Sequence, residues 1–118
     1  MGFRRPTAAE QALLDKLLAP TFPGSNELRA QLEGLDVRII DEDGGLELRP
    51  GPGPYAEVLD RIPVEGELLD RDGVKAHVLL HVIDGRLHEL EVYKEDGSRM
   101  FQLKAERMTV ECFGAGQD

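Results

Sequence analysis

The sequence has no tryptophan, one cysteine, four phenylalanines and two tyrosines. With so few aromatic side chains, leucine, valine and isoleucine must supply most of the core. The single cysteine cannot form an internal disulfide, which argues against a small secreted protein held together by disulfides. The N-terminus also has no apolar stretch of signal-peptide length. We therefore expect a cytoplasmic protein.

Basic residues are scarce as well, because 14 Lys and Arg stand against 23 Asp and Glu, for a net charge of −9. This charge repels phosphate backbones and anionic lipids, so we expect neither nucleic acid nor a membrane as a partner. Solubility alone is an ordinary reason for such acidity. The partner that the charge favours is a cation or a basic protein.

Motifs for catalysis and for cofactors are absent from the sequence. Gly51 and Gly53 alternate with prolines, which have no amide to offer a phosphate. Cys112 has no histidine near it in sequence, and the three histidines accompany no serine or cysteine nucleophile in an identifiable motif. We therefore expect no cofactor, and the sequence leans towards a protein that is not an enzyme.

Four Asp-Gly pairs, beginning at residues 43, 72, 84 and 96, end or interrupt runs of alternating apolar and polar residues. Asp tolerates a bent backbone and Gly adopts positive φ without a steric cost, so each pair favours a hairpin turn. The last three pairs lie 12 residues apart, which predicts an antiparallel meander of strands 62–69, 74–83 and 87–93.

The N-terminal region carries the signals of two helices. Thr7 and Glu10 have the spacing of a capping box, and four leucines at 13, 14, 17 and 18 then recur at helical spacing before Pro20. Ser25 is placed to cap a second, shorter helix that ends near Gly34. Both helices should pack on the sheet.

These elements predict an α+β fold, with two N-terminal helices packed on one face of a mainly antiparallel meander sheet. We expect a single domain over residues 1–118. Its parts are a helical region (1–34), a hairpin (35–49), a Pro/Gly loop (50–54) and the meander (55–118).

The register of the meander follows from its apolar pattern. A two-residue turn at Asp84-Gly85 that continued without a bulge would mix core and solvent residues, whereas a bulge at Gly85 makes Val78 oppose Leu90. Ala76 then opposes Val92, and the same rule at Asp72-Gly73 pairs Val64 with Leu80 and Leu68 with Ala76. The predicted core residues are Ile62, Val64, Leu68, Ala76, Val78, Leu80, Val82, Leu90 and Val92.

The opposite, outer face is then acidic but not purely polar. The predicted rows are Glu67-His77-Glu91, Glu65-Leu79-Glu89 and Pro63-His81-Leu87, with Tyr93 on the same face and His88 on the core face. A further strand over 99–103 would add Phe101 and Leu103. An apolar patch with a charged rim suits protein binding. The predicted partner-binding residues are Glu65, Glu67, His77, Leu79, Glu89, Glu91 and Tyr93.

Other interpretations of this face remain open. It can be an ordinary solvated sheet face, or the C-terminal segment 108–113 can cover it. Glu67, His77 and Glu91 can bind a metal such as zinc, and a small-ligand or metal-dependent enzyme can be centred there. His77 and His81 are about 13 Å apart along a strand and cannot share a metal. Self-association is a further option, and Pro63 suits an edge strand.

The stretch 80–93 follows the pattern Leu-His-Val-x-Asp-Gly-x-Leu-x-Glu-Leu-Glu-x-Tyr and continues through residues 94–98. It resembles a hairpin in a family of small, uncharacterised bacterial proteins, some of which look like immunity proteins of polymorphic toxin systems. With Arg5-Pro6-Thr7 and the leucine-rich helix, the likeness covers most of the chain. It implies a binding protein whose acidic face docks the basic active site of a toxin, and it implies no catalytic residue.

Overall fold

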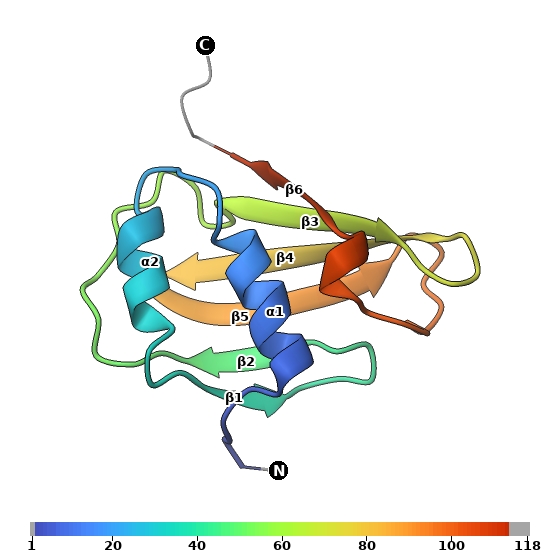
Figure 1. The fold of residues 1–118 in the computed structure, drawn as a ribbon, viewed down its shortest axis with the longest axis horizontal. Coiled ribbons are helices and arrows are strands. Elements are labelled where there is room, and N and C mark those ends of the chain that lie inside the picture. The colour runs from blue at the N-terminus through green and yellow to red at the C-terminus, as the bar shows by residue number, and fades with distance from the viewer. Residues whose placement is uncertain (1, 114–118) are drawn as a thin grey trace.

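The computed structural model describes residues 2–113, which form two helices on one face of a six-stranded antiparallel sheet (Figure 1). The predicted α+β class with N-terminal helices is therefore confirmed. The helices are α1 (Ala8–Leu17), α2 (Ser25–Gln31) and the short 3-10 helix η1 (Ala105–Arg107). The strands are β1 (Asp36–Ile39), β2 (Leu46–Arg49), β3 (Val64–Leu69), β4 (Lys75–Ile83), β5 (Arg86–Lys94) and β6 (Thr109–Cys112).

The strand order is β1-β2-β5-β4-β3-β6, with the predicted meander at its centre. The first hairpin joins β5 through the pair Leu46 and Leu90, so the segments on either side of the Pro/Gly loop share one sheet. The segment 108–113 contributes β6, which extends the sheet beside β3 instead of covering its outer face. Strand β3 is therefore internal, which corrects the expectation that Pro63 marks an edge.

The helices form for the predicted reasons, with one exception. Thr7 and Glu10 make the capping box of α1, and the four leucines at 13, 14, 17 and 18 are buried. In α2, Ser25 is not the cap, because left-handed Gly24 (φ 91°) precedes the helix and Ser25 already belongs to it. The Ser25 hydroxyl instead accepts the Phe22 amide at 3.1 Å.

The core lies between the helices and the sheet, and its β3–β4 register is as predicted. Val64 pairs with Leu80 and Leu68 with Ala76. Of the predicted core residues, Ile62 alone is half-buried and lies outside β3. The other eight, Val64, Leu68, Ala76, Val78, Leu80, Val82, Leu90 and Val92, are all buried.

The turn between β4 and β5 differs from the prediction. Asp84 (φ 52°) and Gly85 (φ 76°) form a two-residue turn, and the extra residue lies further on, where His81 pairs with Glu89 and leaves His88 as a bulge. The predicted pairs are wrong by two residues, because Val78 pairs with Val92. Side chains alternate between the two faces of a strand with a period of two residues. A shift of two residues in the pairing therefore leaves the inward residues facing inward.

Moving the bulge changes two assignments. Leu87, predicted on the outer face, is 2% exposed in the core, and His88, predicted to face the core, is exposed. The amide of Leu87 donates to the buried side chain of Gln31 at 2.9 Å, and the same side chain donates to the Gly85 carbonyl at 2.8 Å. Helix α2 therefore holds the turn beside the bulge.

The predicted strand over 99–103 does not form. Buried Asp70 accepts the amides of Phe101 and Gln102 at 2.7 and 2.9 Å, which uses backbone groups that a strand would pair. The same carboxylate lies 3.0 Å from the ammonium of Lys94, whose side chain is fully buried. Phe101 and Leu103 therefore do not extend the outer face beside β5. Segment 99–103 is a loop that is held by hydrogen bonds to Asp70.

Replacing Gly85 by Ala should destabilise the protein more than replacing Gly73 by Ala. Both glycines have positive φ, which costs an alanine about 1–2 kcal/mol. A Cβ at Gly85 would also lie 2.8 Å from the Ala56 carbonyl oxygen, whereas a Cβ at Gly73 meets nothing within 4 Å. Urea unfolding of both variants measures the difference, and equal losses would contradict it.

Replacing Asp70 by Asn should remove a pH-dependent part of the stability. Burial alone raises the pKa of Asp70, but the amides of Phe101 and Arg71 and the ammonium of Lys94 outweigh it and lower the pKa well below 3.8. The carboxylate therefore stabilises the fold fully above about pH 4, and this contribution is lost as the pH falls through the folded pKa.

We expect Asp70→Asn to lose about 3 kcal/mol near neutral pH, because Lys94 is left with a weaker partner in the core. The loss of stability should be smaller in acid. Urea unfolding near neutral pH and in acid would measure the two losses. Asp72→Asn is the matched control, since Asp72 contacts the same ammonium at 2.7 Å but is partly exposed. A larger loss in the control would refute the assignment.

Candidate functional site

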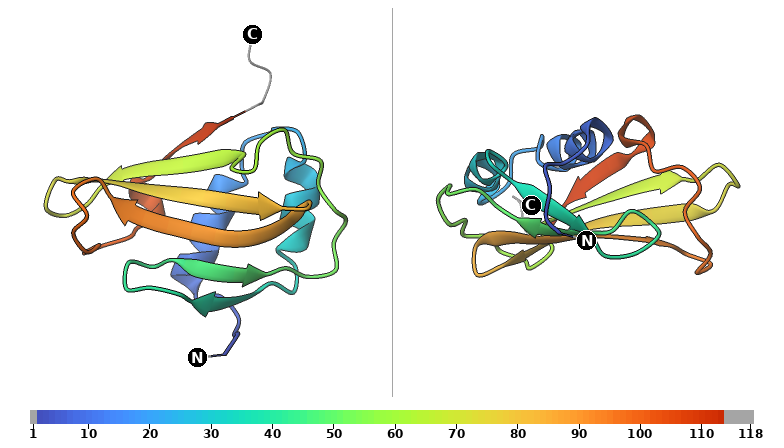
Figure 2. Two further views of the ribbon diagram at one scale, coloured as in Figure 1. Left: turned by 180° about the vertical axis from the view of Figure 1, so that it is seen from behind. Right: turned by 90° about the horizontal axis from the view of Figure 1, so that it is seen from below.

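The outer face of the sheet, opposite α1 and α2, carries the candidate site (Figure 2). Its β1–β2 half is neutralised by ion pairs. Arg38 pairs with Glu47, and Arg49 lies 3.1 Å from Asp36. Both guanidinium groups also lie over the ring of Phe3, at 4.6 and 4.2 Å from its centroid. The charges of this half are therefore already satisfied within the chain.

The other half, over β5, β4, β3 and β6, is strongly acidic. The Lys75 ammonium lies 3.6 Å from the carboxylate of Glu67. Cross-strand pairing sets the carboxylates on one face. We call this set the acidic patch: Glu65, Glu67, Glu89, Glu91, Glu95 and Glu111. It contains all four predicted glutamates.

The rows of the patch differ from the prediction because of the shifted bulge. His77 lies between Glu67 and Tyr93, and Leu79 lies between Glu65 and Glu91. The predicted row Glu67-His77-Glu91 is therefore wrong, as are the rows that ended in Glu89 and Leu87. The seven predicted binding residues nevertheless share this face.

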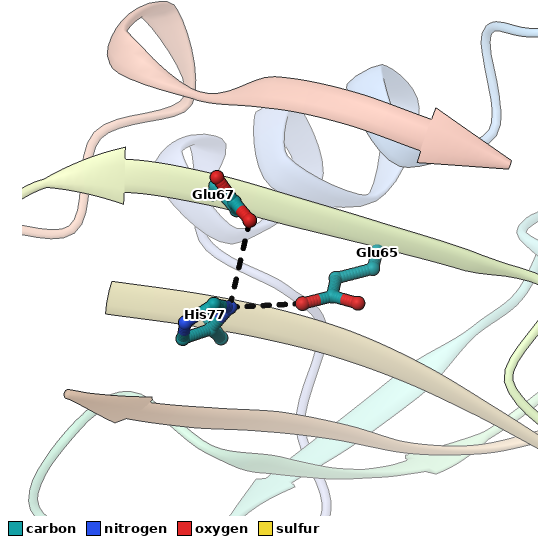
Figure 3. Close-up of side chains that lie close together, drawn as sticks. All are labelled: Glu65, Glu67 and His77. Atoms are coloured by element: carbon teal, nitrogen blue, oxygen red, sulfur yellow. Dashed lines mark hydrogen bonds and ion pairs between the residues drawn. The ribbon is translucent and has the colours of Figure 1, made fainter. Parts of the chain in front are cut away.

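His77 lies among the carboxylates of the acidic patch and contacts several side chains. Its Nδ1 lies 2.8 Å from a Glu65 oxygen and 4.0 Å from a Glu67 oxygen (Figure 3), and its Nε2 lies 2.7 Å from Glu95. Its ring stacks on Tyr93 with centroids 5.0 Å apart. Burial alone lowers the pKa of His77, but the hydrogen bonds to Glu95 and Glu65 raise it more, so the imidazolium form is favoured.

Tyr93 and His81 also lie between these carboxylates. Burial, and then the charges of Glu65 and Glu91, raise the pKa of the Tyr93 hydroxyl, which stays protonated. His81 uses Nε2 to bond Glu91 at 2.8 Å, while its Nδ1 is buried without a hydrogen-bond partner among residues 2–113. His77 and His81 thus each bind carboxylates of the patch.

Two carboxylates of the patch and the His77 imidazole have the spacing of metal ligands. One ligand atom each from Glu65, Glu67 and His77 lie within 4.8 Å of one another. The predicted set with Glu91 is wrong, because Glu91 lies opposite Leu79 and bonds His81 instead. Glu65, which extends from β3 towards Nδ1, takes the place that Glu91 was expected to fill.

Comparison with known proteins identifies the family. Residues 3–104 match a domain of unknown function, DUF6984. The chain belongs to this family. The matched span includes both α-helices and β1 to β5 and stops before β6. No curated protein and no solved structure matches the chain. The expectation of an uncharacterised family is confirmed to that extent.

Within residues 2–113, none of the helices has the length and apolar character required to cross a membrane.

Sequence reasoning missed two members of the acidic patch in this DUF6984 chain. Glu95 lies just after the predicted end of its strand, although the alternation of Glu89, Glu91 and Tyr93, continued by two residues, would have found it. Glu111 was missed because no local pattern shows that β6 pairs with β3, where Glu111 lies opposite Glu65.

Neutralising either hydrogen-bond partner of His77 should lower its pKa. The carboxylates of Glu95 and Glu65 are the groups that raise it, so Glu95→Gln and Glu65→Gln should each shift the imidazole titration to lower pH. NMR titration of the His77 ring protons measures this directly. Glu89→Gln is the control, because Glu89 lies opposite His81, and a shift of His77 in that variant as large as in the others would contradict the assignment.

Proposed function

We propose that this protein is a non-catalytic protein-binding module whose acidic patch docks a basic partner. The observation that carries the proposal is the concentration of six carboxylates on the half of the outer face where no arginine of residues 2–113 pairs with them, while the β1–β2 half is neutralised. Neither α1 nor α2 covers this face (Figure 2). Such a one-signed surface steers a basic protein towards it and speeds association.

The patch also offers apolar contact. Tyr93 is 41% exposed, and half-buried Leu79 lies between Glu65 and Glu91. A tyrosine and an aliphatic side chain inside a charged rim have the composition of a protein interface, in which the apolar centre supplies contact area and the rim supplies orientation. A basic protein fits this face better than a free small cation, because it can use both parts.

The chemistry of the described residues supports a role without catalysis. His77 and His81 make their hydrogen bonds to glutamates, so neither ring activates a hydroxyl or thiol group within residues 2–113. Burial raises the pKa of the Cys112 thiol, which disfavours the nucleophilic thiolate.

We further propose that the basic partner is a toxin. The resemblance of the 80–93 hairpin to immunity proteins implies that the acidic patch would cover a basic active site and block substrate entry. Many enzymes that act on nucleic acids have such basic sites, because they must hold phosphates. A cytoplasmic location would place the protein where it meets such a toxin.

Reversing the charge of the patch should abolish binding to the partner. Proteins captured from a lysate of the native host would be purified and re-tested one by one by titration calorimetry. We expect Glu65, Glu67, Glu89 and Glu91 changed to Lys to weaken binding at least about 100-fold, since attraction becomes repulsion. Affinity for the native chain should fall as salt rises.

The matched control reverses four exposed carboxylates away from the patch, Asp15, Glu33, Glu57 and Asp60, and so changes the net charge equally. It should bind the partner within a few-fold of the native chain. Equal binding by the patch variant, once its fold has been verified by circular dichroism, would refute the proposal. Inhibition of a captured toxin by the native chain alone would support the immunity role.

A further inference from the structure

The cluster around His77 brings together the donor atoms that a transition-metal ion requires. Nδ1 of His77 lies 2.8 Å from Glu65 and 4.0 Å from Glu67, and the three ligand atoms lie within 4.8 Å of one another (Figure 3). The imidazole distinguishes this group from an ordinary run of surface glutamates, because it supplies a nitrogen ligand between two oxygen ligands. The cluster also lies on two paired strands, which keeps the groups together.

The imidazole ring is held in the orientation that a metal ligand needs. Its Nε2 lies 2.7 Å from Glu95, and the ring stacks on Tyr93. When the proton stays on Nε2 and is donated to Glu95, the lone pair of Nδ1 points towards Glu65 and Glu67. A carboxylate on the far nitrogen is the usual way in which proteins orient a metal-binding histidine.

Small side-chain movements close the site. Ligand atoms around a tetrahedral zinc ion are about 3.4 Å apart, given metal–ligand distances of about 2.0–2.2 Å. The three ligand atoms here lie within 4.8 Å of one another. Glu67 can make up the difference, since its side chain is 42% exposed and the Lys75 ammonium, 3.6 Å away, is itself 44% exposed.

The charge balance of the patch favours a divalent ion. Strand pairing brings the carboxylates of the patch together, and a divalent ion held by Glu65, Glu67 and His77 would place two positive charges among them. The ion would therefore relieve the repulsion between these carboxylates.

We propose that Glu65, Glu67 and His77 bind a divalent first-row transition ion, with Zn²⁺ as the best match, and that Glu95 positions the histidine. One nitrogen and two carboxylate ligands suit Zn²⁺ or Mn²⁺ better than Mg²⁺ or Ca²⁺, which prefer all-oxygen sites. Three protein ligands leave a fourth position for water. This proposal does not rest on the docking function, although Glu65, Glu67 and His77 lie on the face proposed to dock the partner.

Metal titration of the chelator-treated full chain tests the site without any partner. Zinc should raise the melting temperature, because it binds the folded protein in preference to the unfolded one. Co²⁺ should give the visible absorption of a tetrahedral site. His77→Gln and Glu67→Gln should abolish both signals, and Glu95→Gln should weaken zinc binding about 10–100-fold while the three ligands remain.

Glu89→Gln removes one patch carboxylate outside the cluster and should leave zinc affinity within about twofold of the native value. Glu67→Gln guards against a folding artefact, since Glu67 is a partly exposed side chain. Absence of a zinc effect on the native chain would overturn the proposal, and so would an undiminished effect in Glu67→Gln or His77→Gln. Either failure leaves the docking proposal standing, because that proposal requires no metal.

Discussion

The bulge at His88 is the constraint on which both faces of the sheet depend. The two-residue turn at Asp84-Gly85, continued without an extra residue, would pair His81 with His88 and turn the apolar residues of β5 towards solvent. Inserting His88 restores the alternation, so that Leu90 and Val92 enter the core and Glu89, Glu91 and Tyr93 face outward. Gln31 stabilises this region by accepting the Leu87 amide. The core and the acidic patch are thus two consequences of one inserted residue.

The acidic patch destabilises the isolated folded chain, since like charges on neighbouring strands repel each other. Contacts within the fold reduce this repulsion. His77 is shared between Glu65 and Glu95, His81 bonds Glu91, and Lys75 lies near Glu67. Glu89 and Glu111 have no such partner among residues 2–113 in the ion pairs of the structure. The repulsion that remains is what a basic protein, or an ion at His77, would relieve on binding, which connects the electrostatics of the patch to both proposals.

A second, different charge arrangement stabilises the fold where β3 and β5 end. Lys94 and Asp70 are buried on the core side, where the carboxylate also accepts the amides of the 99–104 loop. Here opposite charges are matched and sealed from water, so they serve structure. On the outer face the carboxylates outnumber their cations and remain in contact with solvent. The same residue types therefore have opposite roles on the two faces, and burial decides which.

Much of the fold could be predicted because it depends on local patterns. The capping box of Thr7 and Glu10, the leucine stripe of α1 and the positive φ at all four Asp-Gly turns follow from neighbouring residues. The alternation of β3 to β5 assigned the acidic residues to one face even though the bulge was misplaced by a few residues. That error left these face assignments correct, because a shift of two residues in the strand pairing preserves the side of the sheet on which each residue lies.

Apart from Leu87 and His88 beside the bulge, the sequence by itself determined which residues of β3 to β5 face inward and which face outward, because side-chain alternation and turn chemistry act over a few residues. Only the tertiary structure decided which outward residues meet. Pairing of β2 with β5 and of β6 with β3, the bulge at His88 and the capture of the 99–104 loop by Asp70 all depend on contacts between distant segments. Those contacts place Tyr93 instead of Glu91 beside His77 and bring Glu65 and Glu95 to its two nitrogens, a result that no local pattern contains.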